Sequence, residues 1–217
     1  NTAACTFTVT VNDNQNPAIT CPANIALNTA PGICSAVATY TTPTPTDNCP
    51  GATAACVPAS GSTFQKGVTT VTCTATDASN NTAACTFTVT VTDNQNPTIT
   101  CPAAQALVLN SSCAGVLADY RSLATVADNC TASGSLTVTQ SPAAGTAVSG
   151  VGTTVVTLTV TDASGNSANC TFNVNRVDTT LPTITCPAAQ TLVLNSSCAG
   201  VLADYRSLAT VADNCTA

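Results

Sequence analysis

The hydrophobic and polar residues of Cys85–Thr92 alternate along the whole segment. Cys85, Phe87, Val89 and Val91 share one parity, and threonines occupy the positions of the other parity. Period-two alternation is typical of a β-strand with one buried and one exposed face, and threonine suits the exposed side. We therefore predict a half-buried strand whose cysteine sulfur faces the core.

Turn signals flank this strand on both sides. Asp77–Asn81 precedes it with Asp, Ser and Asn, which accept local backbone hydrogen bonds and favour turns. Asp93–Pro97 ends it, and Ile99–Pro102 begins another short strand pattern. The segment predicts the end of one small β-domain and the start of the next.

Parts of this sequence recur elsewhere in the chain, and so do other segments. Asn1–Val11 is identical to Asn81–Val91, and Leu107–Ala132 is identical to Leu192–Ala217. The dipeptide Cys-Pro returns at intervals of roughly eighty residues, at Cys21, Cys101 and Cys186. This period is too long for a solenoid unit and suits a small independent domain. We expect the last strand of one repeat at 1–13, whole repeats at 14–93 and 94–178, and the first part of another at 179–217. Because both outer segments read as parts of repeats, we expect the sequence to belong to a longer protein.

Short strands separated by turn signals predict an all-β fold of tandem immunoglobulin-like sandwiches, rich in disulfides. In the first repeat we expect strands at Ala18–Cys21 and Cys34–Thr41, among others. The stretch Val116–Ala127 has helical propensity but aligns with a strand of the first repeat. Tertiary context overrides propensity, so we expect a strand at Val116–Tyr120 and a loop or single helical turn at Arg121–Val126.

Fourteen cysteines and no histidine define the chemistry of this chain. The sequence is 44% hydrophobic but only 3% aromatic, so each repeat has little large apolar surface to bury. Cysteines at this density, without histidine, indicate structural disulfides rather than metal ligands. The chain is therefore expected outside the cytoplasm.

The second repeat has four cysteines, which allow three pairings. In an immunoglobulin-like sandwich the first and last strands run parallel at one edge, which favours Cys101–Cys170 and leaves Cys113–Cys130. Cys56 and Cys73 occur together only in the first repeat, so we expect them to be partners. The equivalent expected pairs elsewhere are Cys21–Cys85, Cys34–Cys49 and Cys198–Cys215, with Cys186 bonded to a cysteine outside this sequence. Closing the loop between the first and last strands stabilises a repeat by about 4 kcal/mol.

Charge and residue content exclude several functions. The net charge is −6, with four basic residues and no basic cluster, which argues against nucleic acid and anionic membranes as partners. No apolar run approaches the length of a membrane span. Without histidine, and with Asp as its only acidic residue type, the chain lacks the usual catalytic and zinc-binding constellations, so we expect no enzyme.

Five motifs together resemble the hyalin repeat (HYR) domain. They are Cys21–Asn24, Gly32–Tyr40, Asp47–Cys49, Phe64–Val71 and Thr76–Val91. The second repeat is similar to the variant found in long secreted surface proteins of Bacteroidota. The resemblance implies an immunoglobulin-like fold, a role in extracellular adhesion or spacing, and no catalytic residues. The second repeat departs from the pattern by lacking the phenylalanine of F-x-x-G.

The junctions between repeats are acidic and resemble the calcium-binding linkers of cadherins. Oxygen ligands there favour calcium and a stiffened junction, from Asp13, Asn14, Asn16, Asp93, Asn94 and Asn96. The alternative is that these residues only cap strands and shape turns. The third junction keeps only Asp178, which weakens the calcium interpretation.

Three accessible asparagines are glycosylation candidates, at Asn80, Asn110 and Asn195. For function we expect a structural stalk or extracellular fibre at the cell surface, whose partners are neighbouring repeats, other fibre subunits or surface glycans. The alternative is an adhesin that binds glycans or a protein through its loops. Three tyrosines and near-identical repeats favour a spacer.

Overall fold

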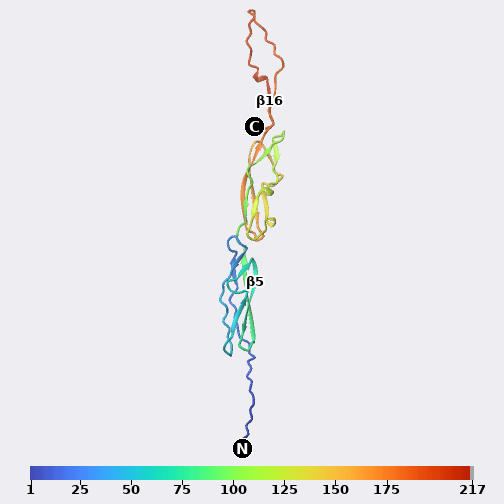
Figure 1. The fold of residues 1–217 in the computed structure, drawn as a ribbon. Coiled ribbons are helices and arrows are strands. Elements are labelled where there is room, and N and C mark those ends of the chain that lie inside the picture. The colour runs from blue at the N-terminus through green and yellow to red at the C-terminus, as the bar shows by residue number, and fades with distance from the viewer. Residues whose placement is uncertain (216–217) are drawn as a thin grey trace. The chain divides into compact units, whose positions relative to one another are not determined.

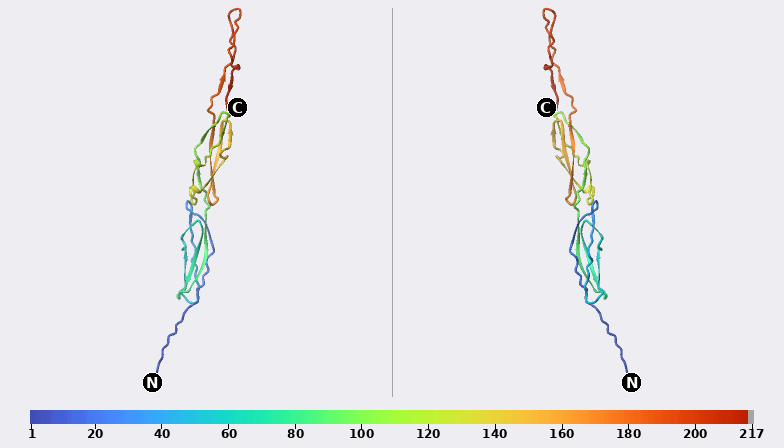
Figure 2. Two further views of the ribbon diagram at one scale, coloured as in Figure 1. Left: turned by 90° about the vertical axis from the view of Figure 1, so that its right-hand side faces the viewer. Right: turned by 90° about the vertical axis from the view of Figure 1, so that its left-hand side faces the viewer.

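A computed structural model describes residues 1–215 and divides the chain into two compact units. Unit 1 contains residues 1–97, 127–135 and 162–166, and unit 2 contains residues 98–126, 136–161 and those from 167 onward. In Figure 1 most of unit 1 runs from blue to green, and unit 2 from green to red. Both units are built from strands, as the two side views also show (Figure 2).

Residues 1–97 of unit 1 form a four-stranded sheet and a two-stranded sheet. The strands are β1 (Ile25–Asn28), β2 (Ser35–Val37), β3 (Thr53–Val57), β4 (Thr63–Gln65), β5 (Gly67–Thr76) and β6 (Thr82–Thr92). The larger sheet has the order β1-β6-β5-β3, and β2 pairs with β4. Strand β1 runs parallel to β6, whereas the other pairs are antiparallel. The first and last strands therefore lie side by side, as the sequence predicted.

The core of unit 1 lies between these two sheets. Phe87, Val89 and Val91 on β6 are almost fully buried, while the threonines between them are more accessible. They pack against Phe64 of β4 and Ala38, which follows β2. The predicted alternation of Cys85–Thr92 is confirmed, and it is the pattern of a sandwich with one sheet face in the core.

Unit 2 repeats this plan. The later strands are β7 (Thr98–Thr100), β8 (Gln105–Val108), β9 (Ala114–Val116), β10 (Thr125–Ala127), β11 (Thr137–Ser141), β12 (Ala147–Ser149), β13 (Gly152–Thr161), β14 (Ser167–Val177), β15 (Thr183–Thr185) and β16 (Thr210–Ala212). Among residues 1–215, short 3-10 helices lie at Arg121–Leu123 and Arg206–Leu208 in unit 2 and at Ser133–Ser135 in unit 1. The larger sheet has the order β11-β13-β14-β8, with β8 parallel to β14. Short pairs join β9 to β12, β7 to β10 and β15 to β16.

The core of unit 2 again centres on a phenylalanine and valines of the two longest strands, but it has leucines where unit 1 has alanines and cysteines. Val156 and Leu158 on β13 and Val174 on β14 are fully buried against Leu117 and Tyr120. In each unit a tyrosine ring meets a phenylalanine ring edge-on, with centroids 5.0 Å apart in unit 1 and 5.3 Å in unit 2. The chain is thus all-β, with tandem immunoglobulin-like sandwiches held by several disulfides.

Three of the expected strand positions need correction. Ala18–Cys21 forms only an isolated bridge between Ala18 and Thr46. The strand predicted at Cys34–Thr41 is shortened to β2, because its partner β4 pairs with it only over Ser35–Val37. The strand predicted at Val116–Tyr120 ends at Val116 instead of starting there, and the single helical turn lies at Arg121–Leu123.

Identical sequences take different environments in this chain. Phe7 is 85% exposed and lies in no strand, whereas Phe87, its equivalent in β6, is 3% exposed. Leu202 is 75% exposed, whereas its equivalent Leu117 is 1% exposed. Strand β6 is flanked by β1 and β5, and residues 1–11 have no paired strand among the described residues. In unit 1 the apolar side chains of β6 are buried because the β2–β4 pair covers their face.

Candidate linkage site between repeats

Three disulfides lie within single repeats. Cys21 bonds to Cys85 and Cys101 bonds to Cys170, with Cα atoms 5.6 and 5.7 Å apart. Each bridge ties the residues just before β1 or β8 to the last strand of the repeat, β6 or β14. That last strand runs parallel to β1 or β8. Cys56 bonds to Cys73 across the β3–β5 pair. These are the pairs expected from the sequence.

The other expected pairs are wrong. Cys34 bonds to Cys130 rather than to Cys49, so Cys130 does not pair with Cys113. Cys113 bonds to Cys215, so Cys198 does not pair with Cys215. Both bridges follow one rule: the second cysteine of one repeat bonds to the Asp-Asn-Cys cysteine of the next. The expectation failed because it assumed that each repeat closes all its bridges internally.

Cys130 is held by the two residues before it. Asp128 Oδ2 accepts the backbone N–H of Cys130 at 2.9 Å and that of Thr131 at 2.7 Å. Asn129 Nδ2 donates to the carbonyl of Ile33 at 3.1 Å, next to Cys34 in the chain. The Asp thus fixes the turn and the Asn binds the partner loop, which brings the Cys130 sulfur to Cys34.

Asp128 also belongs to a cluster of three carboxylates with Asp93 and Asp162, all in unit 1. One oxygen from each lies within 4.8 Å of the others. The Asp93 side chain is completely buried, and its Oδ2 lies 3.6 Å from Lys66 Nζ and 3.0 Å from Ser164 Oγ. Lys66 therefore supplies a positive charge where three negative ones meet.

Asp162 is satisfied by its own turn. Its Oδ1 accepts the backbone N–H groups of Ser164 and Asn166, both at 2.8 Å, and its Oδ2 accepts Asn166 Nδ2. Burial raises the pKa of Asp162, but the hydrogen bonds from Asn166, Ser164 and Gly165 outweigh it, so the pKa is lower than usual. Asp128 Oδ1, in contrast, is buried without a hydrogen-bond partner in the described chain.

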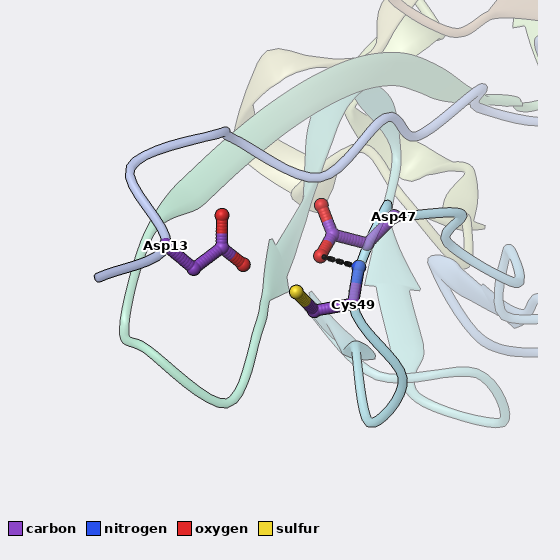
Figure 3. A group of neighbouring side chains, drawn as sticks. All are labelled: Asp13, Asp47 and Cys49. Carbon is purple, nitrogen blue, oxygen red and sulfur yellow. Dashed lines mark hydrogen bonds between the residues drawn. The ribbon is translucent and has the colours of Figure 1, made fainter. Parts of the chain in front are cut away.

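A related cluster contains Asp13, Asp47 and Cys49 (Figure 3). Asp47 Oδ2 accepts the backbone N–H of Cys49 at 3.0 Å, and the Cys49 thiol faces the gap between the two carboxylates. The pKa of this thiol is raised, first by its hydrogen bond to Asp13, then by burial and by the charges of Asp13, Asp47 and Asp77. Among the described cysteines, four are unpaired: Cys5, Cys49, Cys186 and Cys198.

The structure separates the residues proposed for calcium. Asp93 is buried and Asp13 half-buried, each in a carboxylate cluster, whereas the neighbouring asparagines are exposed, at Asn14, Asn16, Asn94 and Asn96. Sequence reasoning missed Asp47, Asp128 and Asp162 as companions, although an Asp in each Asp-Asn-Cys motif was a usable signal. Carboxylate oxygens suit calcium, and calcium at the junctions stays a prediction.

The glycosylation candidates Asn80, Asn110 and Asn195 are all exposed. The side-chain oxygen of Asn110 accepts the backbone N–H groups of Ser112 and Ala114, and Asn195 repeats this arrangement. Their modification stays a prediction.

The fold and these bridges define a disulfide-linked array of immunoglobulin-like repeats. The HYR domain family matches residues 12–91 and 92–176, which is most of the chain. The chain therefore belongs to the HYR domain family. This family supports an extracellular repeat protein, which agrees with the cysteine content.

The chain is also similar to individual proteins. Hyalin from Strongylocentrotus purpuratus is 59% identical over 56 residues, which are 24% of this chain and 5% of hyalin. Among solved structures, Drosophila N-cadherin EC1-4 has a TM-score of 0.41 at 15% identity, covering 75% of this chain and 50% of the cadherin. Mouse cadherin-23 EC22-24 has a TM-score of 0.40 at 17% identity, covering 76% and 65%. Within residues 1–215, no helix is long and apolar enough to cross a membrane.

Proposed function

We propose that this chain is a non-enzymatic, load-bearing segment of a secreted or cell-surface protein, which forms an extended stalk or extracellular fibre. The observation that carries the proposal is the pair of bridges Cys34–Cys130 and Cys113–Cys215. Each joins one repeat covalently to the next, in addition to the peptide bond between them. A domain that only presents a binding loop does not need such links.

These bridges limit how far the chain can be stretched. The shortest covalent path from end to end passes through Cys21–Cys85 and Cys113–Cys215 and includes roughly 50 residues of backbone, or about 180 Å fully extended, and the path through Cys34–Cys130 and Cys113–Cys215 is nearly the same length. The fully reduced chain of 217 residues extends to about 750 Å. The residues that lie off this path are in loops closed by disulfides, so they cannot add to the length under tension.

Single-molecule stretching between the two termini tests this proposal. The oxidised chain should stop lengthening near 180 Å, and the same molecule should reach about four times that length in reductant. A double variant with Ala at Cys34 and Cys113 keeps the bridges within repeats and should give an intermediate length. An oxidised wild-type chain that extends as far as the reduced one would refute a load-bearing role.

The adhesin remains the competing function. The adhesin would be supported if a glycan or protein ligand binds the isolated chain and if substitutions in the loops abolish this binding. Saturable binding with no effect of the bridges on extension would favour the adhesin over the stalk.

A further inference from the structure

Four cysteines lie in one row across the larger sheet of unit 1. Cys56 on β3 is directly opposite Cys73 on β5, and Cys73 is directly opposite Cys85 on β6. Cys21 precedes β1, the strand on the other side of β6, and bonds to Cys85. The disulfides Cys21–Cys85 and Cys56–Cys73 therefore lie end to end, in the strand order β1-β6-β5-β3.

The four side chains of this row share one core. Residues directly opposite each other on neighbouring strands project from the same face of a sheet. Cys56 and Cys73 belong to the buried core of unit 1, and Cys21 and Cys85 pack against it as half-buried residues. Cys73 and Cys85 are thus direct neighbours in the core, although each is bonded to a different cysteine.

The register also suits a bridge between Cys73 and Cys85. Directly opposite residues of an antiparallel pair have Cα atoms about 4.5 or 5.5 Å apart. Disulfides span Cα separations of about 4.4 to 6.8 Å. Unit 1 already contains one disulfide between directly opposite residues, Cys56–Cys73. Cys73 can therefore bond to either of its neighbours without a change of strand register.

The row places an attacking and a leaving sulfur on opposite sides of Cys73. Thiol–disulfide exchange proceeds by attack of a thiolate on one sulfur of a disulfide, with departure of the other sulfur on the far side. Cys85 on β6 and Cys56 on β3 flank Cys73 on β5 from the two sides. A thiolate at Cys85 is thus positioned to displace Cys56 from Cys73.

Solvent access determines which bridge a reductant reaches first. Cys73 is 0% exposed and Cys56 is 9% exposed, whereas Cys21 and Cys85 are both half-buried. The rate of exchange depends on access to the sulfur that is attacked. A small thiol therefore reaches Cys21–Cys85 before Cys56–Cys73.

We propose that this row is a redox switch, in which reduction of Cys21–Cys85 moves the neighbouring bridge from Cys56–Cys73 to Cys73–Cys85. In the oxidised state each bridge holds one edge of the sheet, the segment before β1 on β6 and β3 on β5. After the exchange a single bridge joins the two central strands, and both edges lose their covalent link. The switch lies within one repeat and is independent of the bridges between repeats.

The exchange consumes two molecules of a small thiol such as glutathione. The first glutathione thiolate attacks the Cys21 sulfur, forms a mixed disulfide there and releases the Cys85 thiolate. The Cys85 thiolate attacks the Cys73 sulfur and releases the Cys56 thiolate. The second glutathione thiolate attacks the glutathione sulfur on Cys21 and releases the Cys21 thiolate. Two protein disulfides become one, two glutathiones become glutathione disulfide, and their two protons pass to Cys21 and Cys56.

Unit 2 has the same sheet without this row and is an internal control. Leu158 is directly opposite Cys170, where unit 1 has Cys73 opposite Cys85. Gln140 is opposite Leu158, in the place of Cys56. Reduction of Cys101–Cys170 therefore produces a thiol whose neighbour across the strand pair is a leucine.

The test uses the whole chain with serine at the cysteines that are unpaired in it, which are Cys5, Cys49, Cys186 and Cys198. After limited reduction with glutathione, acid quenching and alkylation, non-reducing peptide mapping should find Cys73–Cys85 peptides in molecules alkylated at Cys21 and Cys56. In unit 2, Cys101 and Cys170 should be alkylated together, without a new bridge.

A variant that produces the Cys85 thiol without any reductant gives a second measurement. In the same serine background, Cys21→Ser should yield both Cys56–Cys73 and Cys73–Cys85, in amounts within about tenfold of each other, because both bridges close short loops. The matched variant Cys101→Ser should keep Cys170 as a thiol and leave the bridges of unit 1 unchanged.

Hydrogen exchange then shows whether the sheet responds as proposed. In molecules that carry Cys73–Cys85, amide exchange should become faster in both β1 and β3, while β5 and β6 stay protected. The switch is overturned if Cys56–Cys73 persists in every molecule that has lost Cys21–Cys85 and if Cys21→Ser keeps Cys85 as a thiol. Bridges from Cys85 to cysteines of unit 2 would reveal exchange through unfolded chains and would also refute it.

Discussion

Replacing Lys66 by methionine should destabilise unit 1 far more than its surface position suggests. Methionine keeps most of the apolar stem but removes the charge that lies 3.6 Å from the fully buried Asp93 carboxylate. Asp93 would then face Asp128 and Asp162 without that cation. A buried charge that loses its partner is the costly case among ion pairs.

The expected magnitude follows from distance and exposure. Two unit charges at this separation attract by about 4 kcal/mol at the effective dielectric of a protein surface. The Lys66 side chain is 32% exposed, so water screens part of this attraction. We expect a loss of about 2 kcal/mol, which lowers the Tm of a domain of this size by about 8 to 16 °C.

Calorimetry of the oxidised chain measures this change, and two variants control it. Arg121→Met removes an ion pair with Asp119 in which both side chains are about half exposed, and it should have almost no effect. Asp93→Asn combined with Lys66→Met should recover most of the lost stability, because the unpaired charge is gone. If Lys66→Met were as mild as Arg121→Met, or if Asp93→Asn gave no recovery, Lys66 would not neutralise the cluster.

Four further predictions concern stability and ions. Replacing Cys21 and Cys85 by alanine should lower the free energy of unfolding by about 4 kcal/mol in chemical denaturation, whereas Cys5→Ser should not. Tyr40→Phe removes the hydrogen bond from its hydroxyl to the Pro58 carbonyl and should cost about 1 kcal/mol in the same assay. Folding lowers the pKa of Asp162, so its carboxylate stabilises the fold at pH values above its ordinary pKa of 3.8. This stabilisation is lost as the pH falls through the lower pKa of the folded state. The Asp162→Asn variant should therefore be less stable than the wild type at pH 7, and its Tm should fall less below pH 4. If calcium binds the junctions, it should raise the Tm in calorimetry, and Asp128→Asn should abolish that rise; an unchanged Tm at millimolar calcium would leave these carboxylates as turn formers.

The sequence predicted the parts of the fold that depend on local pattern. The alternation of Cys85–Thr92 identified β6 and its buried face, and the period of the repeats identified the tandem organisation. Bridges between the first and last strands followed from the parallel edge of a sandwich. Each of these is decided within one repeat, where neighbouring strands are close in sequence or fixed by topology.

Predicting the bridges between repeats would have needed information that no single repeat contains. Cys34 and Cys49 are near each other in sequence, but the turn that bonds to Cys34 comes from residues 128–130. The hydrogen bond from Asn129 to Ile33 selects this partner, and side-chain hydrogen bonds over such separations leave no periodic signal. The same limit hid the approach of Lys66 to Asp93.

The asymmetry of the bridge between repeats bears on how such a protein changes its length. Every whole repeat has one loop with the second cysteine and one Asp-Asn-Cys turn. The loop bonds to the following repeat and the turn to the preceding one. Duplication or deletion of a whole repeat therefore leaves no cysteine in the interior without a partner. Leu107–Ala132 and Leu192–Ala217 are identical, and recombination between such segments would produce these events. Copy number can then vary by single repeats without any compensating mutation in the neighbouring ones.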